Sequence, residues 1–440
     1  MRKYFTRLFF STGFAVLVAF VIRVLVFRSY LHEFDDKIVR DFTQFGAETG
    51  AVAASIARGQ GFSSPLAGHT TGPTAWFAPL YPYLLAGVFK LWGVFSYPSD
   101  LAIHFINLAI SAFTCWPIAA VGDRAFGKKT GAAAAWFWVV LPNAIYFPVV
   151  WVWDTALAAF WMALMVAVTL KLRGSSRMRD WLAYGALWAI GGLINPSLLA
   201  VLPFLAIWAI WPLRRELTQA TKLAAASALL FAVMIAPWSV RNYVVFHRFI
   251  PLRSNFGLEL WLGNNPDVTD TCSCSLHPTT DAGEAAKYAQ MTEIPYMEQK
   301  QSEALAFMRT HPVDTLRFTF RRFEDTWLGV WDAPMDVWRS SHASIKALVV
   351  FNCSFSLLAL GGVLAAFRRT NDAATPLGAV LMAFPAVFYL THPSSRYRFP
   401  MDPIMLVLAT YVLGALVASL PVGRRDTAGA VAQPLAQGTD

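Results

Sequence analysis

The stretch that decides the fold class is MRKYFTRLFFSTGFAVLVAFVIRVLVF, residues 1–27. Three basic residues precede a long apolar run that a single charged residue, Arg23, interrupts. The run exceeds the apolar region of a signal peptide, about 7–15 residues, and no small-residue cleavage site follows it. We therefore expect an uncleaved first transmembrane helix, with Arg23 near its far end reaching the lipid headgroups.

The composition of the whole chain agrees with a membrane protein. Of its 440 residues, 56% are hydrophobic and only 14% are charged, against roughly 25% charged in soluble domains. We expect an all-α polytopic membrane protein of about ten transmembrane helices, because each helix needs ~20 apolar residues. The expected spans lie near residues 8–27, 101–122, 131–148, 152–170, 181–195, 197–212, 223–240, 345–367, 376–391 and 401–420.

Basic residues gather in the loops on one side of these spans. That side carries Arg2, Lys3, Arg7, Arg124, Lys128, Lys129, Lys171, Arg173, Arg177, Arg179, Arg214, Arg215, Lys222, Arg368, Arg369, Arg424 and Arg425. Positively charged loops stay cytoplasmic, so both termini are expected there. The net charge of +9 is then a topology signal, and we expect membrane lipids, not nucleic acid, as partners.

Two long connections are expected on the outer side, 28–100 and 241–344. They divide the chain into an N-terminal membrane module (1–240, including the first outer loop), an extracytoplasmic segment (241–344), C-terminal membrane helices (345–424) and a disordered tail (425–440). An apolar run from Leu80 to Phe95 carries Lys90 and is short, so we expect an interfacial helix there.

The four cysteines carry no expected chemistry. Cys115 and Cys353 lie in apolar segments and fit small core residues. Cys272 and Cys274 are two residues apart, a spacing that is poor for a mutual disulfide.

Two acids stand out on the expected outer side. In FGAETGAVAASIARGQGFSSP (45–65), helical spacing gives an amphipathic surface helix with Glu48 at the margin of its apolar face. A plain solvated acid is the competing interpretation of Glu48. Asp154, in VVWVWDT, follows two interfacial tryptophans at the start of an expected span, where a helix N-cap is the alternative role.

A pair of arginines stands out in HPSSRYRFP, residues 392–400, the one short outer connection that carries basic residues. Two prolines flank the segment, so we expect an extended chain in which Arg396 and Arg398 point the same way. Two guanidiniums on one face would clamp phosphate oxygens, although contact with ordinary phospholipid headgroups explains the pair too.

The order of these motifs resembles a known family. FGAETGAVAASIARGQGFSSP, GPTAWFAPLYPYLLAGVFKLWG, VVWVWDT, LELWLGNNP and SSRYRFPMDPIML run along nearly the whole chain. Together they resemble the GT-C superfamily of integral-membrane glycosyltransferases. The nearest branch is the bacterial one related to protein mannosyltransferases, aminoarabinose transferases and rhizobial core-galacturonosyl transferases. The resemblance departs in two places. No Lys precedes APLYPY as it does in the aminoarabinose branch, and Glu48 stands where Asp is more usual.

The resemblance implies a bacterial inner-membrane enzyme with helices parallel to the membrane on its outer face. It would transfer a hexose or pentose, with inversion, from a polyprenyl-phosphate-linked donor to an acceptor glycan, lipid or protein. The implied catalytic residues are Glu48 and Asp154, with Asp35 and Asp36 as alternatives for the base. The implied phosphate-binding residues are Arg396, Tyr397 and Arg398.

Three further questions stay open at the level of sequence. Asn264 and Asn265, among aromatic residues, are candidates for acceptor binding, with a packed cap over the membrane helices as the alternative. No cofactor is certain, and a divalent cation such as Mg²⁺ or Mn²⁺ would suit the carboxylates. The rival functions are a transporter or flippase of a lipid-linked sugar, and a polymerase or ligase of lipid-linked glycans.

Overall fold

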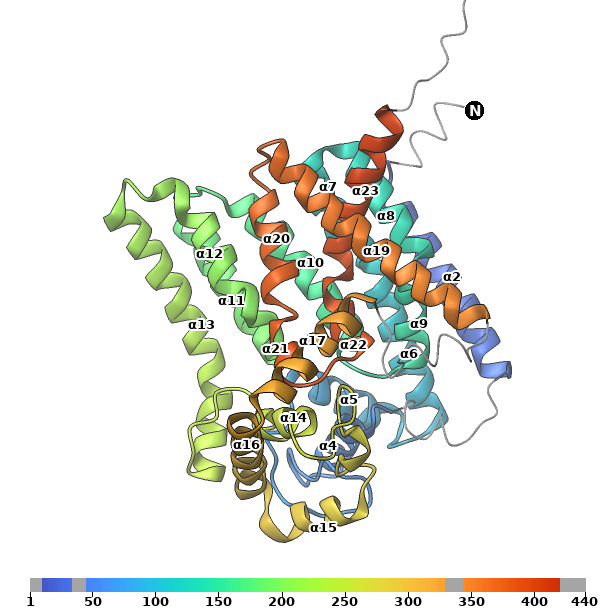
Figure 1. Cartoon of the computed structure of the whole chain (residues 1–440), viewed down its shortest axis with the longest axis vertical. Coiled ribbons are helices and arrows are strands. Elements are labelled where there is room, and N and C mark those ends of the chain that lie inside the picture. Colours follow the sequence, from blue (N-terminus) through green and yellow to red (C-terminus); the bar gives the residue numbers. More distant parts are fainter. Residues whose placement is uncertain (1–9, 34–44, 329–342, 420–440) are drawn as a thin grey trace, which may run out of the picture.

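The computed structural model describes residues 10–33, 45–328 and 343–419 (Figure 1). Most of those residues are helical, and no strand lies among them apart from one isolated bridge between Ser63 and Pro73. Within these ranges seven helices are long and apolar enough to cross a membrane, or eight if the bent pair α8–α9 counts as one span. The expectation of an all-α, multi-pass membrane protein is confirmed. Asp35, Asp36 and the tail 425–440 lie outside the described residues.

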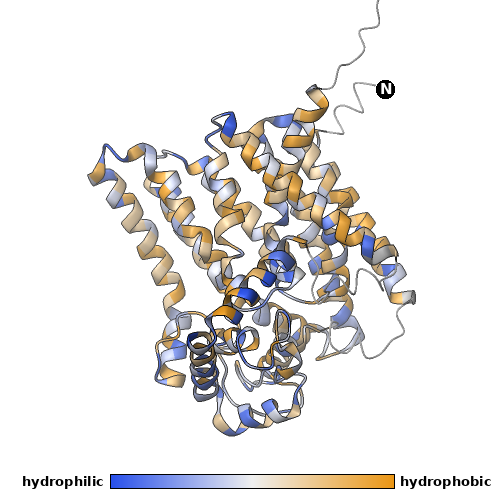
Figure 2. Ribbon diagram, viewed as in Figure 1, coloured by the Kyte–Doolittle hydropathy of each residue, from blue (hydrophilic) through white to orange (hydrophobic). Residues whose placement is uncertain are grey.

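Each expected span coincides with a helix or a run of short helices. These are α2 (Thr12–Glu33), α6 (Tyr97–Phe113) with α7 (Cys115–Phe126), α8 (Lys128–Val140) with α9 (Pro142–Val150), α10 (Thr155–Leu172), α11 (Met178–Ile194), η1 (Pro196–Val201) with α12 (Leu202–Ile210) and η2 (Trp211–Leu213), α13 (Leu217–Phe246), α19 (Ala343–Arg368), α20 (Ala374–Ala383) with α21 (Ala386–Leu390), and α23 (Asp402–Ser419). Apolar residues cover these helices, while polar residues concentrate in the loops and in a layer at one end (Figure 2).

That layer contains both long outer connections. The first supplies α4 (Ala47–Ala57) and α5 (Leu80–Trp92); the second supplies α14 (Phe256–Gly263), η3 (Cys274–Leu276), α15 (Ala282–Met291), α16 (Glu293–Thr310) and α17 (Pro312–Leu328). Leu66 and Trp76 from the first connection share a buried cluster with Leu258 and Tyr288 from the second. The two connections therefore fold together into one layer beneath the membrane helices (Figure 1).

Arg23 corrects the expectation that it reaches the headgroups. Its side chain is fully buried, and its guanidinium donates to the carbonyls of Trp138 (3.0 Å) and Ala144 (3.1 Å). A 47° bend separates α8 from α9 here. Pro142 has no N–H, so the Trp138 carbonyl loses its helical partner and needs another donor. Arg23 supplies that donor from α2.

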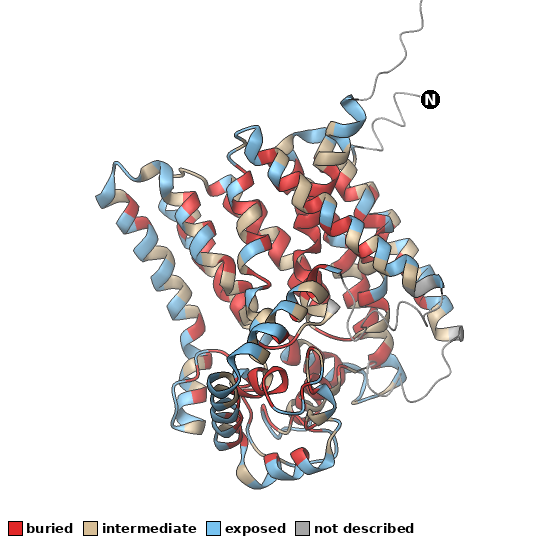
Figure 3. Cartoon of the chain, viewed as in Figure 1, coloured by how far each residue is buried: buried red, intermediate tan, exposed pale blue. Residues whose placement is uncertain are grey.

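One helix stands apart from the bundle. α13 lies at its edge and packs mainly against α11, so most of its surface is exposed (Figure 3). In a membrane, lipid chains would contact that surface, which agrees with its apolar side chains.

Candidate active site

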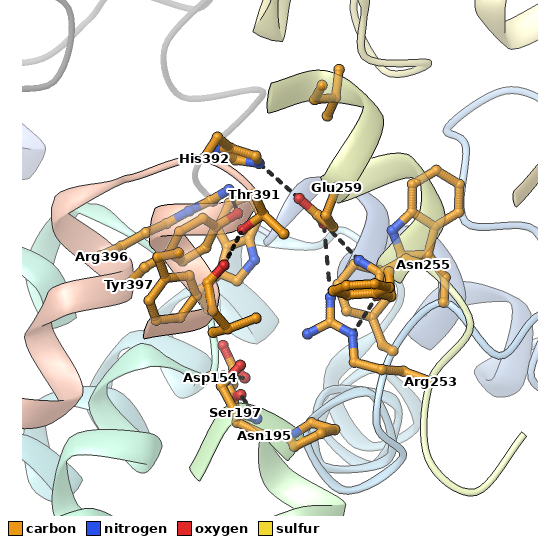
Figure 4. A pocket seen from close by; sticks show the side chains of 18 of the residues that line it. Asp154, Asn195, Ser197, Arg253, Asn255, Glu259, Thr391, His392, Arg396 and Tyr397 are labelled. Atoms are coloured by element: carbon orange, nitrogen blue, oxygen red, sulfur yellow. Dashed lines mark hydrogen bonds and ion pairs between the residues drawn. The ribbon is translucent and has the colours of Figure 1, made fainter. Parts of the chain in front are cut away.

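A cavity of about 540 Å³ lies where the membrane helices meet the outer layer. Its lining comes from the two long outer connections, from the residues just before α10, from the junction of α11 and η1, and from the connection 392–400. They contribute Glu48 and Trp76; Trp153 and Asp154; Asn195; Arg253, Glu259, Cys274 and His277; and His392, Arg396 and Tyr397. Figure 4 shows Arg396 and Tyr397 facing Arg253 and Glu259 across the space, with Asp154 between the two groups. Apolar residues, among them Ala200, Phe384 and Phe388, form another part of the wall.

Glu48 is buried, which corrects the expectation of a surface helix. Helix α4 packs on α5, and its residues Glu48, Thr49 and Val52 are all buried. Glu48 Oε1 lies 3.8 Å from His277 Nε2, while Oε2 is buried with no hydrogen-bond partner among the described residues. A buried carboxylate oxygen without a donor is costly, so this atom is available to a ligand.

Gly46 sets the position of Glu48. It precedes α4 with φ +77°, a conformation that favours glycine. A Cβ on Gly46 would lie 2.4 Å from the carbonyl oxygen of Val152. Only a glycine therefore lets the start of α4 approach the segment that carries Asp154. This contact brings the two acids of separate loops to one cavity.

Asp154 does not cap its helix. The side chain makes no capping hydrogen bond at the start of α10, and its Oδ2 instead accepts from Asn195 Nδ2 at 3.0 Å. Burial raises the pKa of Asp154, although the charges of Arg253 and Arg396 and the Asn195 bond oppose this. Asn195 therefore orients the carboxyl group of Asp154, which lines the cavity.

Arg396 and Arg398 separate, because the segment expected to be extended is the helical turn α22 (Ser395–Arg398). Residues i and i+2 then point about 200° apart. Arg396 lies 4.3 Å over the Trp153 ring, donates to Tyr397 Oη and lines the cavity. Arg398 turns away, pairs with buried Asp402 at 3.3 Å and donates to the Trp327 carbonyl. The double clamp expected from the sequence is wrong.

The second cation of the cavity is Arg253, which was not among the residues predicted for the site from the sequence. Arg253 donates to Asn255 Oδ1 and lies 3.9 Å from Glu259 Oε1. Neighbouring Ser254 donates to Glu293, a buried acid that also accepts from Ala75 N and Tyr288 Oη. Burial raises the pKa of Glu293. This network holds the loop that carries Arg253 in place. No sequence motif around Arg253 predicts that this side chain lines the cavity.

Glu259 and His392 form the third polar contact of the cavity. His392 Nε2 lies 2.7 Å from Glu259 Oε2. Burial alone would raise the pKa of Glu259, but the hydrogen bond and charge of His392, with Arg253 and His277, lower it to about 2. Burial lowers the pKa of His277, against the charges of Glu48 and Glu259. Glu259 lies in the motif LELWLGNNP and His392 in HPSSRYRFP. The sequence predicted a role for other residues of these motifs, the two asparagines of the first and Arg396–Arg398 of the second.

Asn264 and Asn265 do not line the cavity. Both amides are buried; Asn264 donates to the carbonyls of Leu260 and Leu390, and Asn265 donates to Trp261 and Ser273. Their bonds hold the end of α14 in place.

A second cavity, of about 310 Å³, adjoins the first at Glu48. Ala47, Leu66, His69 and Asp281 contribute to its wall, and Thr279 and Thr280 are shared by both cavities. Glu48 therefore lies between two spaces, one facing the apolar helices and one facing the outer layer.

Cys272 and Cys274 form a disulfide, so the expectation of no bond between them is wrong. The backbone of Ser273 is bent, with φ −98° and ψ 51°, and its N–H and hydroxyl both donate to the Leu262 carbonyl. This bend turns the two sulfur atoms toward each other. Cys115 and Cys353 are free.

The fold is shared with archaeal oligosaccharyltransferases. The Archaeoglobus fulgidus enzyme solved with Zn and sulfate matches 92% of this chain at TM-score 0.54 and 12% identity. The oligosaccharyltransferase AglB from the same organism, solved with an inhibitory peptide and a dolichol-phosphate, matches 92% of this chain at TM-score 0.53 and 12% identity. The chain has a GT-C fold. It spans about half the length of these archaeal chains, 49% and 51% respectively.

The GT-C fold expected from the motifs is thereby confirmed. In addition, residues 76–240 match the family described as dolichyl-phosphate-mannose-protein mannosyltransferase. ArnT from Cupriavidus metallidurans, bound to undecaprenyl phosphate, aligns over 93% of this chain and 79% of its own length at 13% identity. Its TM-score of 0.38 adds nothing to the fold assignment. No curated protein matches the chain.

Proposed function

We propose that the chain is a glycosyltransferase that moves a sugar from a polyprenyl-phosphate-linked donor to an acceptor hydroxyl at the outer face of the membrane. The observation that carries the proposal is the convergence of Glu48, Asp154, Arg253 and Arg396 on one cavity that is also walled by apolar residues of the membrane helices. A lipid-linked sugar phosphate needs such a site, apolar on one side and cationic on the other.

The donor would lie across the two kinds of wall. Ala200 from η1, Phe388 from α21 and Phe384 between α20 and α21 would contact the prenyl chain. Arg396 and Arg253 would hold the phosphate from opposite sides, since guanidinium groups suit phosphate oxygens. The rings of Trp153 and Tyr397 hold Arg396 in place, which preorganises the positive charge.

Glu48 would act as the base in an inverting displacement. The acceptor oxygen attacks the anomeric carbon, its proton passes to the Glu48 carboxylate, and the bond to the phosphate oxygen breaks with its electron pair on the phosphate. The unpaired Oε2 of Glu48 supports this role. Asp154, held by Asn195, would orient the acceptor or the sugar. For the departing phosphate, stabilisation of its negative charge by nearby cations matters more than protonation.

The second cavity supports a route for the acceptor. It meets the donor cavity at Glu48 and opens in the outer layer, so an acceptor there would reach the base without crossing the prenyl chain. We propose a glycan, lipid or protein hydroxyl as acceptor and a hexose or pentose as the transferred sugar. The enzyme would lie in a bacterial inner membrane, as the resemblance implies, with cytoplasmic termini, as the charge distribution predicts.

A divalent cation would be held by Glu48 and His277. The carboxylate and ring nitrogen lie 3.8 Å apart, and the unpaired Glu48 oxygen fits a further ligand role. Bound there, a cation would add positive charge near the leaving phosphate. The Mg²⁺ or Mn²⁺ expected from the carboxylates stays a prediction, which the activity after chelation and metal readdition tests.

The function is tested with purified protein, a radiolabelled polyprenyl-phosphate sugar and membrane extract. We expect transfer of label and release of polyprenyl phosphate. Glu48→Gln should abolish both, and Asp154→Asn and Arg396→Ala should slow them about 10²–10³-fold. Glu298→Gln is the matched control, because Glu298 is an exposed acid of the outer layer paired with Arg248. A transporter would release no polyprenyl phosphate with any variant, and that result would refute the proposal.

A further inference from the structure

A cluster of potential metal ligands lies in the wall of the first cavity. The ligand atoms of Cys272, Cys274 and His392 all lie within 4.8 Å of one another. Cys274 Sγ and His392 Nδ1 are 3.9 Å apart. Two ligands of a tetrahedral zinc, with bonds of ~2.3 Å to sulfur and ~2.05 Å to nitrogen, lie about 3.6 Å apart. The existing separation is close to that of ligands on one ion.

Glu259 orients His392 for such a role. The other ring nitrogen, Nε2, is the atom that contacts Glu259 Oε2 at 2.7 Å. In the neutral imidazole this contact places the hydrogen on Nε2 and leaves the lone pair of Nδ1 facing the sulfur atoms. A carboxylate behind a histidine in this way is the usual outer support of a metal-binding histidine. Glu259 itself is held by Asn255 and Arg253.

We propose that the dithiol form of this cluster binds one Zn²⁺ through the two cysteine thiolates and His392 Nδ1, with water as the fourth ligand. Soft thiolates and an imidazole favour Zn²⁺ over Mg²⁺ or Mn²⁺. Cys274 and His392 both line the cavity, which leaves room for the water. The site is separate from the Glu48–His277 pair and does not depend on the proposed glycosyl transfer.

The oxidation state of Cys272 and Cys274 determines whether the site can bind zinc. A dithiol reductant transfers two electrons and two protons to the Cys272–Cys274 disulfide and becomes a disulfide itself. Each thiol then loses its proton when it binds Zn²⁺, so the two thiolates balance the charge of the ion. Oxidation of the pair back to the disulfide removes both sulfur ligands and releases the metal. Cys274 is exposed and Cys272 half-buried, so a reductant can reach the bond.

The test measures zinc retained by the full-length protein in detergent. The oxidised protein and the protein reduced with a phosphine are each loaded with Zn²⁺, passed through a desalting column and analysed by mass spectrometry of the metal. We expect the reduced protein to retain one more equivalent of Zn²⁺ than the oxidised protein. Cys272→Ser with Cys274→Ser, and His392→Ala, should lose it. Glu259→Gln should weaken binding about 10–100-fold.

The matched control is Cys115→Ser with Cys353→Ser, which removes the two free cysteines and should keep the extra zinc. Co²⁺ gives a second readout, because thiolate ligation produces a charge-transfer absorption that the double Cys272/Cys274 variant must lack. Equal zinc in the oxidised and reduced proteins would overturn the proposal. So would zinc that persists in the Cys272/Cys274 double variant or in His392→Ala.

Discussion

At the scale of single residues, Arg396 and Arg398 are two positions apart and serve different ends. Arg396 lies in the cavity against Trp153, whereas Arg398 is buried against Asp402. The helical turn α22 causes this, because a half-turn of helix sends neighbouring side chains to opposite sides. One arginine is therefore available to a substrate, and the other stabilises the bundle.

The two arginines should respond differently to substitution. Arg396→Ala should reduce turnover about 10²–10³-fold with little change in melting temperature. Arg398→Ala leaves the Asp402 carboxylate buried without its charge partner, which typically costs about 3–5 kcal/mol. Thermal unfolding in detergent and turnover of the lipid-linked sugar separate the effects. Equal loss of stability in both variants would contradict the assignment.

Glu259 should make the protein less stable in acid. Its pKa falls from the ordinary 4.5 to about 2 in the folded protein. The ionised carboxylate therefore contributes its full stability above pH ~4.5, and this contribution is lost as the pH falls through ~2. The melting temperature of the wild type should drop between pH 5.5 and pH 3, and that of Glu259→Gln should drop less. Parallel pH curves for the two proteins would exclude Glu259 as a source of the loss.

At the scale of elements, the start of α4 positions the proposed base. Gly46 brings this helix against the Val152 carbonyl, two residues before Asp154. Helix α4 is thus buried between α5 and that segment, although its sequence has the amphipathic pattern of a surface helix. The margin of the apolar face, which the pattern places at the boundary with water, carries the Glu48 carboxylate into a protein cavity instead.

Gly46→Ala should therefore impair activity more than a second glycine substitution of equal backbone cost. Gly59, just after α4, has φ +80° and open space around it, so Gly59→Ala meets only the backbone penalty of about 1 kcal/mol. Gly46→Ala adds a clash with Val152 and displaces Glu48. We expect at least a tenfold larger loss of turnover for Gly46→Ala. Similar losses in both variants would show that the close approach does not position the acid.

At the scale of the whole molecule, the cavity joins the interior of the membrane bundle to the outer layer. Residues of η1 and α21, with Phe384 before α21, form much of its apolar part. The two long outer connections, together with Asp154, Asn195 and the connection 392–400, form its polar part. Neither part alone could hold a molecule that is both a lipid and a sugar phosphate. The arrangement predicts that the length of the prenyl chain of the donor affects its KM.

Ala200→Trp should fill part of the apolar wall, since Ala200 lines the cavity and is half-buried. We expect a higher KM for a long-chain polyprenyl-phosphate sugar and a smaller change for a short-chain analogue, with kcat for the short donor preserved. Steady-state kinetics with the two donors measure this. An equal rise in KM for both donors would place the prenyl chain elsewhere.

The chain's hydropathy and charge pattern determined the membrane class, the succession of spans and the side on which the long connections gather. These are local properties, because about 20 apolar residues make a span wherever they occur. Motif order indicated the fold, and it directed attention to Glu48, Asp154 and Arg396, all of which line the cavity. Tertiary structure alone decided the rest. It turned Arg398 away, drew Arg253, Glu259, His277 and His392 into the cavity, and buried Arg23 against an orphaned carbonyl. Those outcomes depend on contacts between segments far apart in the sequence, such as Glu259 and His392, which are 133 residues apart. Local periodicity holds no information about such contacts.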